Sequence, residues 1–586
     1  MRTFLFLSIL LAAPVAAAAA GPPAAPAAKD DARFERHVEQ LLDGYWRLHP
    51  SYAFTVGYYK YADQLLVPDP AARTATLQFI DKELATLKTF SETSLSPPNR
   101  IDLMLLRNQL ESDRWHLQVF KGWQWQPSNY NVADSFARQL TTPYAPLEKR
   151  LRDMLARLAK VPAFYKAAAA NLDHPTLVHT ELALEQNQGA LGVFDDELRT
   201  QVDGSKLSAA EKAAFHQRVA AAKTAITGYI DFLTALKEKL KKGEGRNFRI
   251  GKELYAQKFA YDIGSGYTAD QLYVKAKAEK AALHDRMEKL ARGLWPKYLG
   301  AKPMPSDRLE LINAVITELS KHHTTPAKFV ETIRQQIPEL EKFVREHDLV
   351  DQDATRPLVV RETPPYLRGV AGAGVDAPGP YDPTANTYYN VSPLEGYTAE
   401  RAESYLREYN DWMLQLLNIH EAVPGHYVQL LHANKSRSLV KSIFGNDAMS
   451  EGWAVYSERM LLDAGYGGAT PELWLVWSKW NLRSVCNTII DYEIHTGELT
   501  REQMVTFLTR EAFQSEAEAV NKWRRATVSQ VQLTSYFDGY SEITALRDEE
   551  KARLGSKFNL RDFNNQFLSY GSAPVKYIRE LLHERN

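Results

Sequence analysis

Apolar side chains recur every three or four residues over most of the chain, which is the spacing of one face of an α-helix. The pattern holds from Phe34 to Arg345 and is clearest over Asp203–Lys242 and Ala269–Leu294, which are rich in Ala, Leu, Lys and Glu. It returns at Thr398 and continues to the C-terminus. The pattern predicts a mainly α-helical protein with a helical scaffold over residues 34–360.

The helical pattern is interrupted between residues 361 and 396, where Pro, Gly, Tyr and Thr dominate. This composition favours loops and short strands, and Thr387–Val391 is the best strand candidate. We expect residues 361–586 to form one continuous fold with the scaffold.

The N-terminus has the pattern of a secretory signal peptide. One positive charge, at Arg2, precedes an apolar run from Phe4 to Ala13 that is too short to span a bilayer. Small residues over Ala16–Ala20 offer an Ala-x-Ala cleavage site. We expect residues 1–20 to be removed, residues 21–33 to form a flexible tether rich in Pro and Ala, and the protein to be periplasmic or secreted.

An uncleaved N-terminal membrane anchor is the alternative, and the shortness of the apolar run argues against it. No cysteine follows that run, so we expect no lipid anchor. No later segment reaches the roughly 18 apolar residues of a membrane helix, and we expect the mature chain to have no membrane anchor.

Composition narrows the possible classes of protein. With 45% hydrophobic and 24% charged residues among 586, the chain has the composition of a folded globular protein. Its 71 basic and 72 acidic residues nearly cancel, so we expect no nucleic-acid partner. The single cysteine, Cys486, rules out internal disulfides and Cys-rich metal sites, which leaves His and carboxylate side chains as metal donors.

One histidine continues the apolar face of a predicted helix. The face is a 3–4 series of Leu406, Tyr409, Met413 and Leu416, and His420 occupies the next position of the series. A lone histidine on such a face is usually a buried core residue, so neighbouring residues decide its role.

Residues 420–426 read His-Glu-Ala-Val-Pro-Gly-His, which is close to the His-Glu-x-x-His pattern of zinc sites but spaced two residues wider. On an undistorted helix, residues six apart are rotated by about 240°, so both imidazoles could not reach one metal ion. The ring of Pro424 clashes with the carbonyl group of His420, and Gly425 tolerates the dihedral angles that follow. We therefore expect a break that brings His426 back toward His420.

The next candidate ligand lies 25 residues after His426. Residues 450–458 read Ser-Glu-Gly-Trp-Ala-Val-Tyr-Ser-Glu and resemble the Asn-Glu-Gly-Phe-Ala-x-Tyr-x-Glu segment of gluzincin aminopeptidases. In that segment the first Glu completes the zinc site, so the resemblance implies that Glu451 is the third ligand. Glu458, on the same helix face, is the alternative ligand, or else it accepts a hydrogen bond from a ligand histidine.

The combined motifs resemble the DUF885 family of gluzincin-like proteins. The resemblance rests on His-Glu-Ala-x-Pro-Gly-His at residues 420–426, on Glu-Gly-Trp-Ala from Glu451, and on Asp491-x-x-x-His495. It implies a metallopeptidase-like helical fold of one or two lobes around a central cleft, with the metal-binding catalytic region in residues 361–586.

The resemblance covers nearly the whole mature chain. Further matching positions are Pro50–Leu66 with Gly57, then Arg525, Gln532, Tyr536 and Gly539, and finally Leu554–Phe558. The chain departs from the family pattern at Gln530, where proline is usual, and at Asn564, where histidine is common. These departures leave the metal motif unchanged.

The motifs predict an exported zinc-dependent peptidase of the gluzincin type. His420, His426 and Glu451 would hold Zn²⁺ and leave one position open, and Glu421 would act as general base beside the metal. Tyr536 would donate a hydrogen bond to the developing oxyanion, although a satisfied core tyrosine is the alternative.

Three further residues are candidates for binding a peptide substrate. Arg525 would bind a substrate carboxylate, or else form a structural ion pair. His495, with Asp491 one helical turn earlier, would line the substrate pocket or form a structural hydrogen bond. Tyr389 lies in the predicted strand, which could pair with an extended peptide by edge addition.

The aromatic residues Trp453 and Tyr456 of the Glu-Gly-Trp-Ala segment have two interpretations. They could contact the substrate, but residues of this size are more often buried in the core. We expect them to pack in the core.

Two other functions use the same residues. One is a zinc amidohydrolase that acts on a small amide, such as a modified amino acid or cell-wall fragment. The other is a catalytically silent binding protein, and the presence of Glu421 argues against it because such a protein needs no base. Among peptidases, Arg525 favours carboxypeptidase action over aminopeptidase action.

Overall fold

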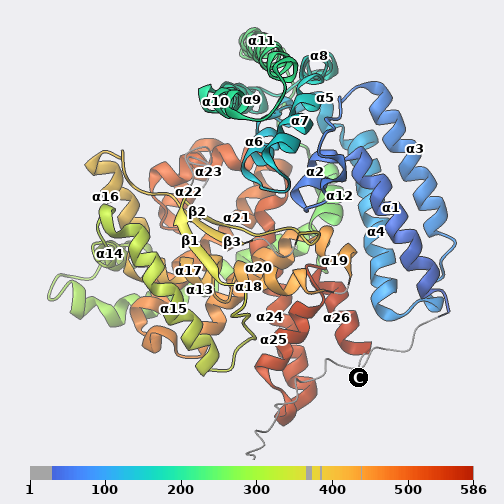
Figure 1. Ribbon diagram of the computed structural model, residues 1–586. Helices are drawn as coiled ribbons and strands as arrows, with labels where there is room; N and C mark the ends of the chain where they lie inside the picture. The colour runs from blue at the N-terminus through green and yellow to red at the C-terminus, as the bar shows by residue number, and fades with distance from the viewer. Residues whose placement is uncertain (1–28, 364–371, 383–385, 437, 585–586) are drawn as a thin grey trace, which may run out of the picture.

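The computed structural model describes residues 29–363, 372–382, 386–436 and 438–584 (Figure 1). The predicted signal peptide, residues 1–20, lies outside the described residues, as does most of the predicted tether. Helix α1 (Asp31–Leu48) begins within the last three residues of that tether.

The described residues are mainly helical, as predicted, with a small sheet. The N-terminal helices are α1, α2 (Pro50–Thr55), α3 (Pro70–Leu87), α4 (Pro97–Trp115) and α5 (Gly122–Trp125). A second group comprises α6 (Ala133–Thr141), α7 (Leu147–Leu158), α8 (Val161–Asn171), α9 (Leu177–Ala190), α10 (Asp196–Gly204) and α11 (Ala209–Leu240). The helices α12 (Lys252–Asp262), α13 (Ala269–Tyr298), α14 (Arg308–Leu319) and α15 (Phe329–Glu346) precede the sheet.

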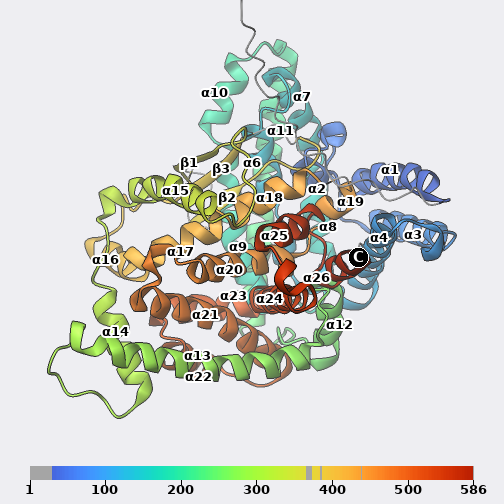
Figure 2. The ribbon, with the colours of Figure 1, turned by 90° about the horizontal axis from the view of Figure 1, so that it is seen from below.

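The C-terminal part is again helical. Its helices are α16 (Ala399–Glu408), α17 (Asp411–Glu421), α18 (His426–Asn434), α19 (Leu439–Ile443), α20 (Asp447–Asp463), α21 (Pro471–Thr496), α22 (Arg501–Glu511), α23 (Glu516–Val528), α24 (Ser535–Leu554), α25 (Leu560–Ser569) and α26 (Val575–Glu584). In Figure 2, α20 lies between α18 and α21. Within the described residues, no helix combines the length and the apolar composition needed to cross a membrane.

Capping side chains fix where the longest helices begin. Ser208 accepts a hydrogen bond from the backbone N–H of Glu211 at the start of α11, and the Glu211 side chain accepts one from the Ser208 N–H. Thr268 and Gln271 make the same reciprocal pair at the start of α13. Each pair satisfies two backbone donors that the first helical turn leaves free.

The predicted break in the helical pattern holds a three-stranded sheet. Its strands β1 (Leu358–Glu362), β2 (Ala373–Asp376) and β3 (Thr387–Val391) lie in the order β1-β3-β2. β3 runs parallel to β1 and antiparallel to β2, so both of its edges are hydrogen-bonded. The prediction of a strand over Thr387–Val391 is confirmed.

The expectation of a single helix carrying the apolar series from Leu406 to His420 is wrong. α16 ends at Glu408, and α17 starts at Asp411. Asn410 causes the restart because its side chain accepts hydrogen bonds from two backbone N–H groups of the first turn of α17. His420 still faces the interior and is 5% exposed.

The hydrophobic core is divided into two clusters. The larger cluster contains residues from both predicted regions, including Trp46, Trp453 and Trp477. The smaller cluster extends from Tyr130 to Leu233 and is formed mainly by α6 to α11, which lie at the top of Figure 1. The predicted scaffold of residues 34–360 thus contributes to two separately packed bodies.

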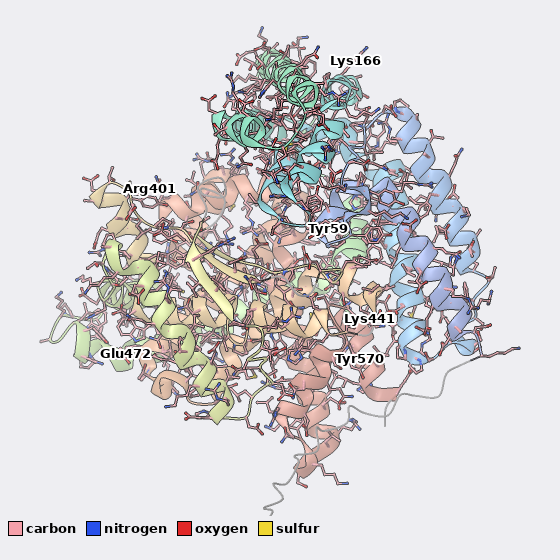
Figure 3. The ribbon with its side chains drawn as sticks, viewed as in Figure 1. Tyr59, Lys166, Arg401, Lys441, Glu472 and Tyr570 are labelled. Atoms are coloured by element: carbon pink, nitrogen blue, oxygen red, sulfur yellow. The ribbon has the colours of Figure 1, made fainter. Side chains whose placement is uncertain are left out.

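A buried ion pair joins the N-terminal helices to the C-terminal region. Lys441 in α19, labelled in Figure 3, pairs with Asp102 in α4, and the Ser438 hydroxyl donates to the same carboxylate. The Lys441 side chain is 3% exposed. Breaking such a pair would leave an uncompensated buried charge, so it holds α4 and α19 together.

Helices α20 and α24 cross with their backbones in direct contact. A Cβ atom on Gly452 would lie 2.3 Å from the carbonyl carbon of Gly539, and one on Gly539 would lie 1.6 Å from the carbonyl oxygen of Ala448. Only glycine fits at these two positions. The crossing brings Glu451, next to Gly452, close to Tyr536, which lies one turn before Gly539.

Candidate functional site

The segment between the two motif histidines breaks the helix, as predicted. α17 ends at Glu421 and α18 begins at His426. The backbone N–H of Gly425 donates to the carbonyl oxygen of Ile419 at 3.0 Å, and a Cβ atom on Gly425 would lie 1.9 Å from the carbonyl oxygen of His420. The chain therefore folds back on itself, and the ring centroids of His420 and His426 lie 4.9 Å apart.

A carboxylate from α20 faces both imidazoles. The Oε2 atom of Glu451 lies 3.5 Å from Nε2 of His420 and 3.4 Å from Nε2 of His426. Potential ligand atoms of all three residues lie within 4.8 Å of one another. The structure thus brings together the three residues that the sequence motifs single out.

These distances test whether the residues suit a metal ion. Ligands about 2.0–2.1 Å from zinc in a tetrahedral site are about 3.4 Å from one another. The two N···O separations, 3.5 and 3.4 Å, are close to that value. Two imidazole nitrogens and one carboxylate oxygen are also a donor set that catalytic zinc sites use, so the residues fit zinc.

Glu458 lies behind His420 and does not face the three-residue cluster. Its Oε1 atom accepts a hydrogen bond from Nδ1 of His420 at 2.8 Å and another from Nε1 of Trp480 at 3.0 Å. This arrangement fixes the orientation of the His420 ring and directs its Nε2 atom toward Glu451. The geometry therefore favours Glu458 as the acceptor for a ligand histidine over its alternative role as a ligand.

Opposing effects set the charges of the cluster. Burial alone would lower the pKa of His420, but hydrogen bonds to Glu451 and Glu458 raise it well above its ordinary value. Burial alone would raise the pKa of Glu451, but His420 and His426 hold it far below its usual range. The Glu451 carboxylate therefore stays ionised between the two imidazoles.

Glu421 lies beside the cluster at the end of α17 and is half-buried. Burial raises the pKa of its carboxyl group, and the charges of His426 and His420 oppose that rise. Within the described part of the chain, the carboxylate makes no hydrogen bond or ion pair. It is therefore available to exchange a proton with a bound molecule.

Tyr536 lies on the other side of Glu451, where α24 crosses α20. Burial raises its pKa to about 12, and the negative charge of Glu451 contributes to the rise. Its hydroxyl accepts a hydrogen bond from Nη2 of Arg525 at 3.3 Å, and the same nitrogen donates to Oε1 of Gln532 at 3.0 Å. Tyr536 is thus a neutral donor close to the cluster at ordinary pH.

Arg525 is exposed on α23. No carboxylate among residues 29–363, 372–382, 386–436 and 438–584 lies within 4.0 Å of its guanidinium group. The alternative of a structural ion pair therefore has no support in the described residues, and the charge is free to meet a ligand.

Asp491 and His495 do not bond to each other, contrary to the hydrogen bond considered from their spacing. His495 Nε2 contacts the carbonyl oxygen of Ala526 at 2.8 Å, and Asp491 Oδ1 accepts hydrogen bonds from the Tyr255 hydroxyl and the Val531 N–H. Both side chains are at most 1% exposed. The expectation that His495 lines the substrate pocket is wrong, because the imidazole is enclosed and bonded to the backbone.

Asp491 and His495 instead hold in place the segment that carries other site residues. Ala526 follows Arg525, and Val531 precedes Gln532. Hydrogen bonds from α21 therefore position the segment that connects α23 to α24 and brings Arg525 to Tyr536.

The proposed peptide contact of Tyr389 is also wrong. Its side chain is 0% exposed, and its hydroxyl donates to Oδ1 of Asn418 in α17 at 2.9 Å. β3 has no free edge because β1 and β2 flank it. Tyr389 therefore supports the helix that carries His420 and Glu421, and edge addition to β3 is not possible.

The aromatic residues of the Glu-Gly-Trp-Ala segment are buried, as expected. Trp453 is 0% exposed, and its Nε1 atom donates to the carbonyl oxygen of Pro424 at 2.9 Å. Tyr456 is 0% exposed and donates to Asn564, one of the two departures from the family pattern. Trp453 thus holds the break between the two histidines against α20.

A cavity of about 540 Å³ lies near the cluster, but none of His420, Glu421, His426, Glu451 and Tyr536 lines it. Asp447, one turn before Glu451 on α20, lines it, and so does Gln532, which is bonded to Arg525. The other lining residues are His116, Leu117, Phe120, Gly122, Trp123, Gln126, Ser128, Asn129, His179, Lys258, Asp262, Ile263, Val528, Ser529, Gln530 and Val531. Gln530, the other departure from the family pattern, therefore lines this cavity.

Several residues near the site carry no motif that would identify them. Trp480 donates a hydrogen bond to Glu458, and Asn418 accepts one from the Tyr389 hydroxyl. Asp447 lines the cavity. Lys522 in α23 has one sequence signal, which is its position three residues before Arg525 on the same helical face.

Comparisons with known proteins extend over most of the chain. A family model described as "Bacterial protein of unknown function (DUF885)" matches residues 50–582. No curated protein matches the chain.

Two solved structures are similar to this chain. The first, from Shewanella oneidensis, is described as "a putative lipoprotein of unknown function", with 52% identity, a TM-score of 0.86, and coverage of 94% of this chain and 99% of that chain. The second, described as "the putative lipoprotein from Colwellia psychrerythraea", has 17% identity, a TM-score of 0.76, and coverage of 94% and 98%. The second likeness shows the fold alone.

Proposed function

The chain belongs to the DUF885 family, and on that premise we propose that it is a zinc-dependent hydrolase that cleaves peptide bonds. The observation that carries the proposal is the cluster of His420, His426 and Glu451, with the carboxylate of Glu421 beside it, which has no partner among the described residues. A binding protein would need the cluster but not a free base.

Zinc is the metal that the donor set suits best, with His420, His426 and Glu451 as its ligands. Three protein ligands leave a position open for a reacting molecule. The chemistry that the metal supplies when bound is that of a Lewis acid, which acidifies water and polarises a carbonyl group.

The remaining steps fall to side chains of this chain. The carboxylate of Glu421 accepts a proton from the attacking water and passes it to the leaving amine nitrogen. The Tyr536 hydroxyl donates a hydrogen bond to the oxyanion that develops on the carbonyl oxygen. Glu458 keeps His420 in the tautomer whose Nε2 atom is free to bind the metal.

The gluzincin type is supported by how the site is assembled. Two histidines and the base come from one motif, and the third donor, Glu451, comes from a separate helix. The resemblance of residues 450–458 to the glutamate-bearing segment of gluzincin aminopeptidases supports the same assignment.

The size of the adjacent cavity favours short substrates. A volume of about 540 Å³ is within the range of pockets that hold small ligands. A short peptide or a small amide, such as a cell-wall fragment, would fit this space, so the second substrate class remains part of the proposal.

Export is a further part of the proposal, and it rests on the apolar run and alanine cluster before residue 21. The word lipoprotein describes the two relatives. In this chain the one cysteine, Cys486, is buried in α21, and we propose an exported protein whose signal peptide is removed. Mass spectrometry of the mature N-terminus tests this, because a first residue other than one near Gly21 contradicts it.

Replacing Glu421 by Gln tests the hydrolase proposal. The change keeps the shape of the side chain and removes the base, so zinc should stay bound while hydrolysis falls by about 10²- to 10⁴-fold. Zinc content, peptide binding and the hydrolysis rate of a mixed peptide library are measured on the same preparation. Glu400→Gln, at an exposed position of α16, is the matched control.

Two outcomes would reject the proposal. Undiminished hydrolysis by the Glu421→Gln protein with zinc in place would exclude Glu421 as the base. Binding of peptides by the unmodified protein without any cleavage would favour the binding-protein alternative.

A further inference from the structure

A group of charged side chains lies between α16, α21 and α23, next to the candidate site. Lys479 pairs with Glu408 at 2.9 Å, and Arg483 pairs with Glu518 at 2.9 Å. The carboxylates of this group, Glu408 and Glu518, are therefore each paired with a cation already.

Two cations of the group remain without a carboxylate. Lys522 is 4% exposed, and among the described residues it makes no hydrogen bond or ion pair. Arg525, one turn further along α23, donates within the described part of the chain only to the neutral oxygens of Gln532 and Tyr536. Buried lysines are rarely left unpaired, so this pair of cations lacks an anion.

The electrostatic surroundings of Lys522 agree with a missing anion. Burial lowers the pKa of its amine well below the ordinary value, and the positive charges of Arg483 and Arg525 lower it further, against a smaller opposing effect of the Glu518 carboxylate. An anion placed among these groups would relieve the repulsion and restore the charged amine.

The two cations lie close to the proposed site of reaction. Arg525 is bonded to the Tyr536 hydroxyl, and Tyr536 lies next to Glu451. One extended residue spans about 3.5 Å. An anion bound by Arg525 would therefore belong to a group only one or two residues from the scissile bond.

We propose that Lys522 and Arg525 bind the terminal carboxylate of the substrate, so that the protein removes residues from the C-terminus of short peptides. This inference rests on the proposed hydrolase function and adds the substrate class. A guanidinium group binds a carboxylate through two parallel hydrogen bonds, and the ammonium of Lys522 adds a third donor. The anchor would recognise the end of a peptide without reading its sequence.

The test compares peptides that differ in one group. The substrates are N-acetyl-Phe-Phe with a free carboxylate, the same dipeptide as its C-terminal amide, and the amide of N-acetyl-Phe-Glu. The third peptide distinguishes a side-chain carboxylate from a terminal one. The readout is the ratio of kcat/KM for the free acid to kcat/KM for the amide.

We expect the unmodified protein to prefer the free acid by at least about 100-fold over either amide, because two charge-assisted contacts are lost in the amides. Lys522→Met and Arg525→Gln should each lower the ratio by roughly 10- to 100-fold. Arg525→Lys should retain part of the preference. Arg525→Gln also removes a hydrogen bond to Tyr536, so the rate on the amide should fall as well, but by less.

Arg524→Gln is the matched control, because Arg524 is exposed and pairs with Glu185. It should leave the ratio unchanged. If a substitution prevents folding, binding of the free acid and of its amide to the Glu421→Gln protein measures the same preference without changing the anchor.

The outcomes separate this inference from the proposed function. If the protein cleaves none of the peptides and binds no zinc, the hydrolase proposal fails. If it cleaves the free acid and its amide equally well, the hydrolase proposal stands and the anchor is wrong. Equal loss on both peptides in Lys522→Met, or cleavage of the Glu amide as fast as the free acid, also overturns the anchor.

Discussion

The indole nitrogen of Trp453 in α20 donates a hydrogen bond to the carbonyl oxygen of Pro424, between the two motif histidines. Glu451 is two residues before Trp453, so one helix supplies a donor to the cluster and also holds the segment that returns His426 to His420. The geometry of the cluster therefore depends on a residue that touches none of its donor atoms.

Trp453→Phe should separate this support from packing, because it keeps an aromatic ring and removes the donor. We expect zinc affinity to fall by about 10- to 100-fold, as for other residues that orient metal ligands. The unpaired carbonyl group should cost about 1–3 kcal/mol of unfolding free energy. Competition with a chelator and urea denaturation measure the two effects.

Trp474→Phe is the control for this substitution. Trp474, on α21, packs against Trp477 of the same helix and against Arg459 of α20. Equal zinc affinities for the two variants would show that the hydrogen bond to Pro424 does not support the site.

The ligand assignment predicts a graded response to alanine substitutions. His420→Ala, His426→Ala and Glu451→Ala should each abolish zinc binding, because each removes one of three donors. Glu458→Ala should keep most of the zinc at saturation but bind it about 10- to 100-fold more weakly, because Glu458 only orients His420. Metal content of the purified variants is the measurement.

His432→Ala provides the control, because His432 lies on α18 with His426 but contacts the backbone of Asp351. It should bind zinc like the unmodified protein. Retention of zinc by Glu451→Ala together with its loss from Glu458→Ala would reverse the two assignments.

Tyr536→Phe should lower kcat by about 10²- to 10³-fold and leave zinc content unchanged, since it removes one donor to the oxyanion. Because the pKa of Tyr536 is raised to about 12, its hydroxyl stays protonated up to alkaline pH. The pH profile of kcat/KM should therefore show no loss from this group below about pH 11. A variant with unchanged kcat would remove Tyr536 from the mechanism.

Asp491 should make the stability of the protein depend on pH. Burial raises the pKa of its carboxyl group from 3.8 to about 7 in the folded protein. The folded state therefore holds a proton that the unfolded state loses, so this contribution is complete below about pH 4 and disappears as pH rises to about 7. A shift of that size corresponds to a change on the order of 4 kcal/mol.

Asp491→Asn should abolish this dependence, because the amide oxygen still accepts from Tyr255 and Val531 while no group titrates. Relative to the unmodified protein, the variant should gain stability between pH 4 and 8. Urea denaturation across that range measures the difference, with the exposed Asp231→Asn as control. A constant difference between variant and unmodified protein would contradict the shifted pKa.

The sequence predicts the helical class, the strand over Thr387–Val391 and the approach of His426 to His420. These features depend on local rules: periodicity, β-propensity, and the incompatibility of Pro424 with a continuous helix. The structure also brings Glu451 to the two histidines, an arrangement for which the sequence offered only a resemblance.

The errors concern residues whose partners are distant in the chain. Tyr389 occupies the predicted strand, but the sequence of one strand does not reveal whether others flank it on both sides. His495 bonds to the backbone of Ala526, which no spacing rule indicates. Lys522 carried no motif, and that it has no partner among the residues described in the structure is visible only once α21 and α23 are packed together.

The two separately packed cores have a consequence for how a molecule reaches the cavity. His179, on a helix of the smaller core, and Asp447, on a helix of the larger one, both line that space. His179 also contacts the carbonyl oxygen of Val528 in α23 at 3.2 Å, so a hydrogen bond joins the two bodies at the wall of the cavity. The shape of this space therefore depends on how the two bodies pack against each other, and not on the interior of either body alone.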